Sequence, residues 1–220
     1  MYKYETHVHT SEGSACANAS GAAQARFYKS RGYTGIIITD HFFNGNTSIP
    51  RELPWVEKVN RFCLGYENAK KCGEEIGLDV FFGWEYSYKG SDFLTYGLDK
   101  QWLIENPIVM DMDLNSYCDF IRDQGGIIIH AHPFREASYI SMIRLIPRKC
   151  DGVEIVNSNR TELENRMAAI YAENYNLLPF AGSDNHTAAQ DKLNGVALES
   201  RISNSQEFVQ LVKNKKYRLF

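Results

Sequence analysis

The stretch Thr6-His7-Val8-His9-Thr10 sets the interpretation of the whole chain, because it places two histidines at the end of a short alternating apolar run. Residues two apart in a strand point to the same face, so His7 and His9 share one face of a strand predicted at residues 3–8. One such pair is weak support for a metal site, since histidines also lie in loops and cores. The positions of the other histidines therefore decide its meaning.

All six histidines lie in short motifs at the ends of predicted strands, and a further strand ends in a glutamate. Clustered imidazoles and carboxylates on one side of a fold are the pattern of a metal-dependent active site. The sequence therefore predicts metal binding. In chain order, these strand-end residues are His7, His9, Asp40, His41, Glu85, His130, His132, Asp184 and His186.

Short apolar runs alternate with helical patterns along the chain, which is typical of parallel β/α units. About seven such units in one domain, residues 1–220, favour a closed or nearly closed α/β barrel. No Gly-x-Gly-x-x-Gly motif follows the first strand, so an open dinucleotide-binding sheet is disfavoured. Predicted strands cover 3–8, 35–39, 78–84, 92–97, 127–133, 152–157, 178–182 and 195–199. Predicted helices cover 19–31, 54–76, 113–124, 136–147, 161–175 and 205–214.

The bulk composition indicates an ordinary globular protein, with 44% hydrophobic and 23% charged residues. A net charge of -3 gives no general attraction to nucleic acid or to an anionic membrane. The five cysteines are widely spaced without a Cys-x-x-Cys pair, which argues against a disulfide framework and against a thiolate zinc site. With no apolar leader and no run long enough to span a bilayer, we expect a cytoplasmic protein.

Five motifs together resemble those of the polymerase and histidinol phosphatase (PHP) superfamily, in the same order along the chain. They are His7-x-His9, Thr39-Asp40-His41, Gly83-x-Glu85, Ala131-His132-Pro133 and Gly182-Ser183-Asp184-x-His186. The resemblance implies a distorted (β/α)7 TIM-like barrel. It also implies two or three divalent metal ions, of zinc, manganese or iron, at the C-terminal ends of the strands. Members of the superfamily hydrolyse phosphoesters.

The resemblance also implies a role for each matching residue. One metal ion would be held by His7, His9, Glu85 and Asp184. The Glu85 carboxylate would bridge to a second ion, which His132 also binds. A third ion would be held by His41 and His186.

Two positions depart from the superfamily pattern. Glu12 stands nearest to the place of the usual Ser-Asp-Gly motif and is the candidate to complete the site of His41 and His186. Asp92 replaces a histidine that often follows the glutamate strand. Asp92 is a candidate oxygen ligand of the ion between Glu85 and His132, which would favour a harder ion such as Mn²⁺. The alternative is that this ion is weakly bound or absent.

Other residues are predicted to support the site. Asp40 is expected to orient a histidine ligand. His130 is predicted to be an outer neighbour of the metal site or a residue of the barrel interior. Arg135 and Arg160 are candidates to bind a substrate phosphate through their guanidinium forks. Where they are not fully committed to metal, His186 or His41 is the candidate to protonate the leaving group.

The predicted function is hydrolysis of a small phosphomonoester, resembling histidinol phosphate or a nucleotide, by a metal-activated hydroxide. The expected partner is this small phosphorylated substrate, with no nucleic acid and no membrane; the oligomeric state stays open. One alternative is an amidohydrolase that cleaves C–N bonds, because those barrels also begin with His-x-His. Another is a metal-binding accessory domain without catalysis. A nuclease role is disfavoured because the chain has no basic stripe.

Overall fold

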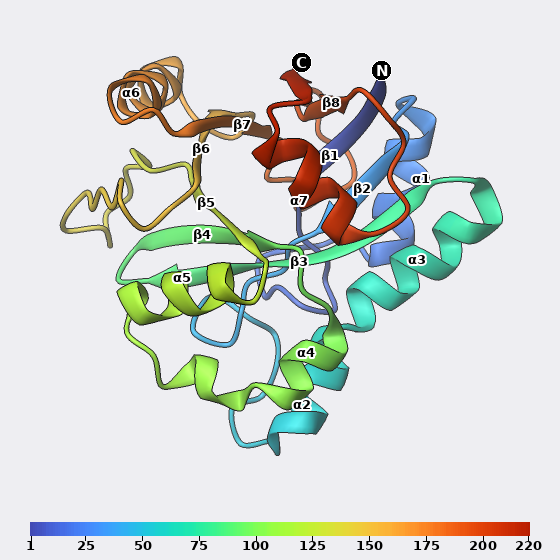
Figure 1. The fold of residues 1–220 in the computed structure, drawn as a ribbon. Coiled ribbons are helices and arrows are strands. Elements are labelled where there is room, and N and C mark those ends of the chain that lie inside the picture. Colours follow the sequence, from blue (N-terminus) through green and yellow to red (C-terminus); the bar gives the residue numbers. More distant parts are fainter.

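The computed structural model describes residues 1–220 as one nine-stranded sheet with helices packed against it (Figure 1). The strands are β1 (Tyr2–Val8), β2 (Gly35–Ile38), β3 (Asp79–Tyr88), β4 (Ser91–Tyr96), β5 (Ile127–Ala131), β6 (Gly152–Asn157), β7 (Leu178–Gly182), β8 (Val196–Leu198) and β9 (Tyr217–Leu219). The helices are α1 (Gly21–Ser30), α2 (Trp55–Phe62), α3 (Leu64–Ile76), α4 (Lys100–Glu105), the 3-10 helix η1 (Pro107–Met110), α5 (Leu114–Asp123), α6 (Glu162–Asn174) and α7 (Ser205–Lys213).

The strands lie in the order β7-β6-β5-β4-β3-β2-β1-β8-β9. The sheet curls so that the end of β7 returns to the end of β1. A bridge between Val8, at the end of β1, and Asn185, just after β7, joins them. The backbone N–H of His9 donates to the carbonyl of Asn185 at 2.9 Å, and the N–H of Asn185 donates to the carbonyl of His7 at 3.2 Å. The predicted α/β fold with a nearly closed barrel is therefore confirmed.

The barrel is distorted because its strands are not all parallel. β4 runs antiparallel to both β3 and β5, and β8 and β9 are also antiparallel additions. β4 follows β3 through the two-residue turn Lys89-Gly90, in which both residues have positive φ angles of 50° and 86°. Such turns match the twist of a hairpin. A hairpin thus replaces one of the expected strand–helix units.

Apolar side chains cover both faces of the sheet and fix the strands in place. Neighbouring residues of a strand point to opposite faces, and Ile128 and Ile129 accordingly belong to different core clusters. α7 packs on the face of Ile129, where its Phe208 contacts the rings of Tyr96 and Phe180. α2, α4 and α5 cover the face of Ile128. Both sides of the barrel wall are therefore held by helices.

α1 and α3 approach each other closely beside β1 and β2. A Cβ atom on Gly21 would collide with the backbone oxygen of Gly65, so glycine is required at this crossing. α3 begins at Leu64 because Cys63 interrupts the helix predicted over 54–76 and divides it into α2 and α3. α4, η1 and β9 were not predicted from the sequence.

The helix predicted over residues 136–147 is wrong, since this segment forms a turn followed by irregular structure. None of its residues is buried, and Tyr139, Met142, Ile143 and Leu145 are exposed. A helix in a protein gains most of its stability by packing an apolar face, and most apolar side chains of this segment stay exposed. Its three isoleucines also have low helix propensity.

Among the helices of this structure, none is both long enough and apolar enough to cross a membrane.

We expect the substitution Phe208→Ala to lower the free energy of unfolding by about 3–5 kcal/mol, because the ring is fully buried between α7 and the sheet. Urea unfolding followed by circular dichroism measures this change. Val56→Ala is the control, since Val56 is 49% exposed on α2 and its truncation should change the value by no more than about 0.5 kcal/mol. A loss as small as that of the control would contradict the packing of α7 described above.

Candidate metal centre

The predicted ligands meet at the C-terminal ends of the parallel strands. Their side chains form three overlapping groups in which the potential ligand atoms lie within 4.8 Å of one another. Each group combines residues from different strands, so only the closed sheet brings them together. The groups are His7, Glu85 and His132; His7, His9 and Asp184; and His9, His41 and His186.

Two carboxylates lie at the centre of the cluster. Glu85 Oε1 is 3.4 Å from His7 Nε2 and 3.2 Å from His132 Nε2. Asp184 Oδ1 is 3.5 Å from His7 Nε2 and 3.3 Å from His9 Nε2. Each carboxylate therefore touches more than one imidazole, as expected of ligands that serve neighbouring metal ions.

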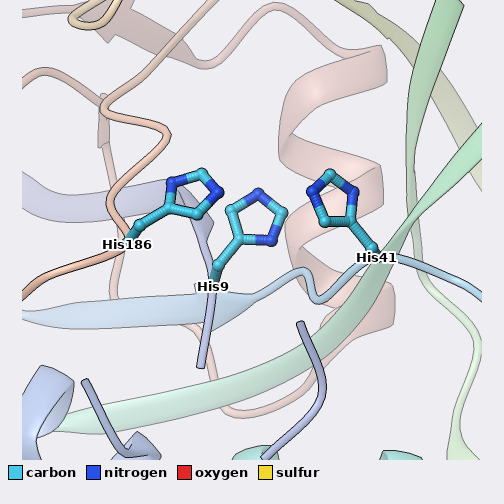
Figure 2. A group of neighbouring side chains, drawn as sticks. All are labelled: His9, His41 and His186. Atoms are coloured by element: carbon cyan, nitrogen blue, oxygen red, sulfur yellow. The ribbon is translucent and has the colours of Figure 1, made fainter. Parts of the chain in front are cut away.

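The rings of His186, His9 and His41 lie in a row, with His9 in the middle (Figure 2). The ring centroid of His9 is 4.2 Å from that of His186 and 4.4 Å from that of His41. His41 is held beside Glu85 by the backbone, because the Glu85 N–H donates to the Asp40 carbonyl at 3.0 Å. Residues from β1, β2, β3 and the end of β7 thus share one wall.

Two buried atoms of the cluster lack a hydrogen-bond partner, which supports a cation site. His41 Nδ1 and Glu85 Oε2 are only 2.7 Å apart, yet their orientation does not meet the criteria of a hydrogen bond. Buried polar groups are almost always satisfied, so such a pair needs another partner. Imidazole nitrogens and carboxylate oxygens are ligands for divalent ions such as Zn²⁺, Mn²⁺ and Fe²⁺, and the donor set fits them.

Glu154 orients the ligands His7 and His132. Its Oε1 lies 3.0 Å from His7 Nδ1, and its Oε2 accepts from the backbone N–H of His132 at 3.1 Å. Because a carboxylate can only accept, the His7 ring donates from Nδ1 to Glu154, and its Nε2 faces the cluster. Asn157 also donates to Glu154 Oε2, at 2.8 Å.

Ser14 and Asp40 orient His9 in the same way. The Ser14 hydroxyl donates to Asp40 Oδ1 at 2.7 Å, while His9 Nδ1 lies 3.0 Å from the same hydroxyl oxygen. That oxygen also accepts from the backbone N–H of His41 at 3.0 Å. Thr10 holds Asp40 through its N–H and its hydroxyl, both at 2.6 Å. The His9 ring therefore also directs Nε2 inward.

The buried charges shift each other's pKa values. Burial raises the pKa of Glu85, but the nearby imidazoles outweigh it and hold this pKa well below its usual range; the same holds for Asp184. Burial lowers the pKa of His7 and of His41, but the adjacent carboxylates outweigh it and raise both pKa values well above the usual range. The pKa of His9 is lowered by burial and by two neighbouring imidazoles. Without metal, the cluster is therefore a network of opposite charges.

Two ligands have unusual backbone conformations. His132 has a φ of 27° and Asp184 a φ of 52°, in the left-handed region that non-glycine residues rarely adopt. Such strain persists only where the surrounding structure imposes it, and it concentrates at functional sites. The turn at His132 also separates it from His130, which precedes it by two residues.

His130 lies away from the cluster. Its ring stacks on Phe93 with centroids 4.6 Å apart and meets Tyr171 edge-on at 6.2 Å. Neither ring nitrogen has a hydrogen-bond partner, and burial lowers the pKa of His130 to about 3. His130 is therefore a neutral ring that packs the outer face of β5, opposite Ile129 in the barrel.

Glu12 and Asp92 also have partners other than the cluster. The Glu12 carboxylate accepts from the Gly21 N–H at the start of α1, at 3.1 Å, and from Asn68 at 3.0 Å. Asp92 accepts from Ser87 at 2.6 Å and pairs with Arg135 at 2.7 Å. Neither residue belongs to a group of potential metal ligands. Asp92 does lie at the wall of the adjoining cavity, whereas Glu12 does not.

A cavity of about 560 Å³ opens next to the ligands. Arg135 and Arg160 both line it, and their Nε atoms are buried without a hydrogen-bond partner. No lysine lines the cavity. The full lining is Cys16, His41, Asn46, Glu85, Ser87, Gly90, Asp92, His132, Arg135, Tyr139, Asn159, Arg160, Asp184 and His186.

Sequence reasoning missed two buried glutamates, Glu5 in β1 and Glu154 in β6. Glu5 accepts hydrogen bonds from the N–H groups of Thr6, His7 and Ser183. Burial raises the pKa of Glu5 to about 7, although these hydrogen bonds lower it. A glutamate in the interior of a predicted strand was the available signal, because charged residues are almost never fully buried unless they are paired.

Sequence reasoning also missed Cys16, whose thiol lies beside His41 and His186 in the cavity wall. Burial would raise the pKa of this thiol, but the neighbouring imidazoles of His186 and His41 outweigh it and lower the pKa to about 6. No motif in the sequence marks this residue, since its position depends on the path of the loop after β1.

Comparison with known proteins gives a consistent picture. A family model described as PHP-associated matches residues 162–190, which include Asp184 and His186. No curated protein matches the chain. The folds of several solved structures match it at low sequence identity.

The first such structure is a two-domain protein from Bacteroides vulgatus that contains a predicted PHP-like metal-dependent phosphoesterase. It is 14% identical with a TM-score of 0.76, and the match covers 100% of this chain and 64% of that protein, so this chain spans less than two thirds of it. A second, from Bifidobacterium adolescentis, has the proposed role of a metal-dependent phosphoesterase. It is 13% identical with a TM-score of 0.61 and 96% coverage of both chains.

A third similar structure is an amidohydrolase from Chromobacterium violaceum with bound sulfate and no metal. It is 14% identical, the TM-score is 0.59, and the match covers 86% of this chain and 89% of that one. At these identities the likeness shows a shared fold.

We expect Ser14→Ala to weaken divalent metal binding by roughly 10- to 100-fold, because it removes the partner that orients His9 and joins it to Asp40. Competition with a fluorescent chelator measures the affinity. Ser11→Ala in the same loop is the matched control, since the Ser11 hydroxyl contacts only the Glu12 carboxylate, at 3.3 Å. Equal affinities of the two variants would contradict the orienting role of Ser14.

We expect metal uptake at pH 7 to release protons, because the raised pKa values keep His7 and His41 protonated in the metal-free protein. Affinity should therefore rise with pH and fall as protons compete for these nitrogens. Calorimetric titration in two buffers of different ionisation enthalpy measures the number of protons released. Identical heats in both buffers would show that the imidazoles bind metal from their neutral state.

Proposed function

We propose that this chain, whose motifs, fold and family match support membership in the PHP superfamily, is a metal-dependent phosphoesterase that acts on a small phosphomonoester. The observation that carries the proposal is the convergence of five histidines and two carboxylates beside a cavity that two arginines line. Divalent ions would supply the Lewis acidity for attack at phosphorus. His7, His9, Glu85, His132 and Asp184 would hold two of those ions. His41 and His186 would hold a third.

Arg135 and Arg160 are proposed to bind the phosphate. Both guanidinium groups line the cavity, and each has a buried Nε that lacks a partner. Arg135 is already fixed by its pair with Asp92, at 2.7 Å, so its remaining N–H groups are held in place for an incoming anion. A guanidinium fork matches the oxygens of a phosphate better than a point charge does.

His186 is proposed to reach the leaving group when it is not a metal ligand. Its side chain is 22% exposed at the cavity, more than those of His41 and His132. Hydrogen bonding with Cys16 and the Asp184 carboxylate outweigh burial and raise the pKa of His186. A protonated imidazole at this place can donate to a departing alkoxide.

Hydrolysis of a C–N bond is the second candidate, favoured by the likeness to the Chromobacterium violaceum amidohydrolase. Amidohydrolases commonly use a carboxylated lysine as a bridging ligand, whereas the lining of this cavity has two arginines and no lysine. That amidohydrolase structure itself holds sulfate, a tetrahedral anion like phosphate. The arginines and the absence of a lysine in the cavity therefore support a phosphoester as substrate.

A cytoplasmic location of the protein stays a prediction.

We expect the protein, reconstituted with Mn²⁺, Zn²⁺ or Fe²⁺, to hydrolyse p-nitrophenyl phosphate. It should leave intact a p-nitroanilide, in which cleavage of a C–N bond would release the coloured product. Asp184→Asn should reduce phosphate release on the order of 100-fold and lower the metal content, because it removes a ligand. Colorimetric assay and elemental analysis measure the two quantities. Met110→Ala, on an exposed face away from the cavity, is the control.

Three outcomes would overturn the proposal. Cleavage of the anilide alone would assign the chain to the amidohydrolases. Bound metal without hydrolysis of either compound would indicate an accessory metal-binding domain. Full activity and metal content in the Asp184 variant would show that the site is elsewhere.

A further inference from the structure

A buried carboxyl group without a cationic partner lies where the barrel closes. Glu5 is in the middle of β1 and is fully buried. Its carboxyl group accepts hydrogen bonds from neutral donors, namely three backbone N–H groups and one hydroxyl. Burying a carboxyl group is costly unless its oxygens are hydrogen-bonded, and apolar residues usually fill such positions. The hydrogen bonds of Glu5 therefore indicate a specific role for this side chain.

Two of these donors lie in an irregular part of β1. The strand pairs with β2 at Glu5 and again at Val8, and the register shifts between these two pairs. Thr6 and His7 lie in between, and both of their N–H groups donate to Glu5 Oε1 at 3.0 Å. A bulge disrupts the ladder locally and re-aims the side chains that it carries. Glu5 thus fixes the backbone of the bulge from which His7 points into the metal centre.

The same carboxyl group reaches across to the end of β7. Its Oε1 also accepts from the N–H of Ser183, at 2.8 Å, and its Oε2 accepts from the Ser183 hydroxyl. Within the sheet β7 pairs with β6 alone, and the bridge between Val8 and Asn185 joins its end to β1. Three N–H groups from the two sides of this junction therefore converge on one oxygen atom of Glu5.

The residues that Glu5 holds carry or precede predicted metal ligands. His7 directs its Nε2 toward Asp184 Oδ1, at 3.5 Å. Asp184 directly follows Ser183 and has its φ angle of 52° in the left-handed region. Such a conformation persists only where the surrounding structure imposes it. The hydrogen bonds from Ser183 to Glu5 constrain the residue before this turn, and the Asn194 N–H also donates to the Ser183 hydroxyl, at 2.9 Å.

We propose that Glu5 is a positioning residue of the metal centre, which fixes the predicted ligands of β1 relative to the ligand that follows β7. Glu5 belongs to none of the groups of potential metal ligands, so it acts through the backbone of His7 and Ser183. Outer partners of this kind hold ligands in the geometry that an ion requires. The inference rests on the metal centre of the proposed function and adds a residue that does not itself bind metal.

Zinc affinity, measured by competition with a fluorescent chelator, tests the proposal in three variants. Glu5→Met has no oxygen acceptor, and we expect it to bind zinc roughly 10- to 100-fold more weakly, as is typical when an outer partner is lost. Glu5→Gln keeps an oxygen for the three N–H donors and should recover most of this loss. Thr6→Val is the matched control, because it removes a different bond between β1 and β7, from the Thr6 hydroxyl to the Ala181 carbonyl at 2.7 Å.

The control separates positioning from stability. Urea unfolding should show that Thr6→Val and Glu5→Met are both less stable than the wild type, whereas zinc affinity should fall only in Glu5→Met. The visible absorption of bound Co²⁺ reports the arrangement of its ligands. It should change in Glu5→Met and match the wild type in Thr6→Val.

A further measurement uses the unaltered protein, so that it does not depend on the folding of a variant. Hydrogen exchange of the metal-free protein, followed by NMR, should show slow exchange at the amides of Thr6, His7 and Ser183. The amide of Ile37, in a buried strand of the same sheet, is the reference for slow exchange.

Four outcomes would each overturn the proposal. They are wild-type zinc affinity in folded Glu5→Met, an equal loss of affinity in Thr6→Val, no recovery in Glu5→Gln, and rapid exchange of the three amides. If Glu5→Met does not fold, the exchange measurement decides. The expected order of zinc affinities, together with a wild-type protein that hydrolyses no phosphate ester, would overturn the proposed function alone.

Discussion

The structure depends on the burial of two negative charges, those of Glu85 and Asp184, in the mouth of the barrel. Glu85 is fully buried and Asp184 is 6% exposed, so water cannot solvate either of them well. A carboxylate without water or a partner is strongly destabilising, and imidazoles from four strand ends surround this pair. The histidines in turn need acceptors, which Glu154 and the Ser14–Asp40 pair provide. One buried charge pair therefore dictates two successive layers of polar side chains.

The ligand motifs could be predicted from the sequence because they follow a local rule. An apolar run that ends in a histidine or carboxylate marks the C-terminal end of a strand, and His41 and Asp184 obey this rule, just after β2 and β7. Glu85 follows the predicted apolar run, but it lies inside β3, which continues to Tyr88. The interior glutamates Glu5 and Glu154 do not obey the rule, since they lie inside β1 and β6 and not at the ends of these strands.

The parts that could not be predicted depend on contacts between distant segments. Whether residue 12 or residue 16 turns toward the cluster is decided by hydrogen bonds between the loop after β1 and residues 46 and 186. The order of β4 in the sheet is decided by a two-residue turn rather than by its own strand sequence. For residues 136–147 the helical pattern was present, but most of the apolar side chains stay exposed and do not pack on the sheet. In each case the deciding partner is far away in the chain.

The irregular segment 136–147 has a consequence for how this protein can evolve. It borders the cavity through Tyr139 and is anchored to the β3–β4 turn by Arg144, which donates to the Lys89 carbonyl at 2.5 Å. None of its residues is fully buried, and only Ile146 packs against the core, so exchanges and insertions at the exposed positions alter the rim of the cavity at little cost in stability. The rim of the cavity and the predicted metal ligands thus belong to different segments of the chain, one exposed and irregular and the other buried at strand ends. Residues at the rim can therefore change over evolution while the predicted ligands keep their positions.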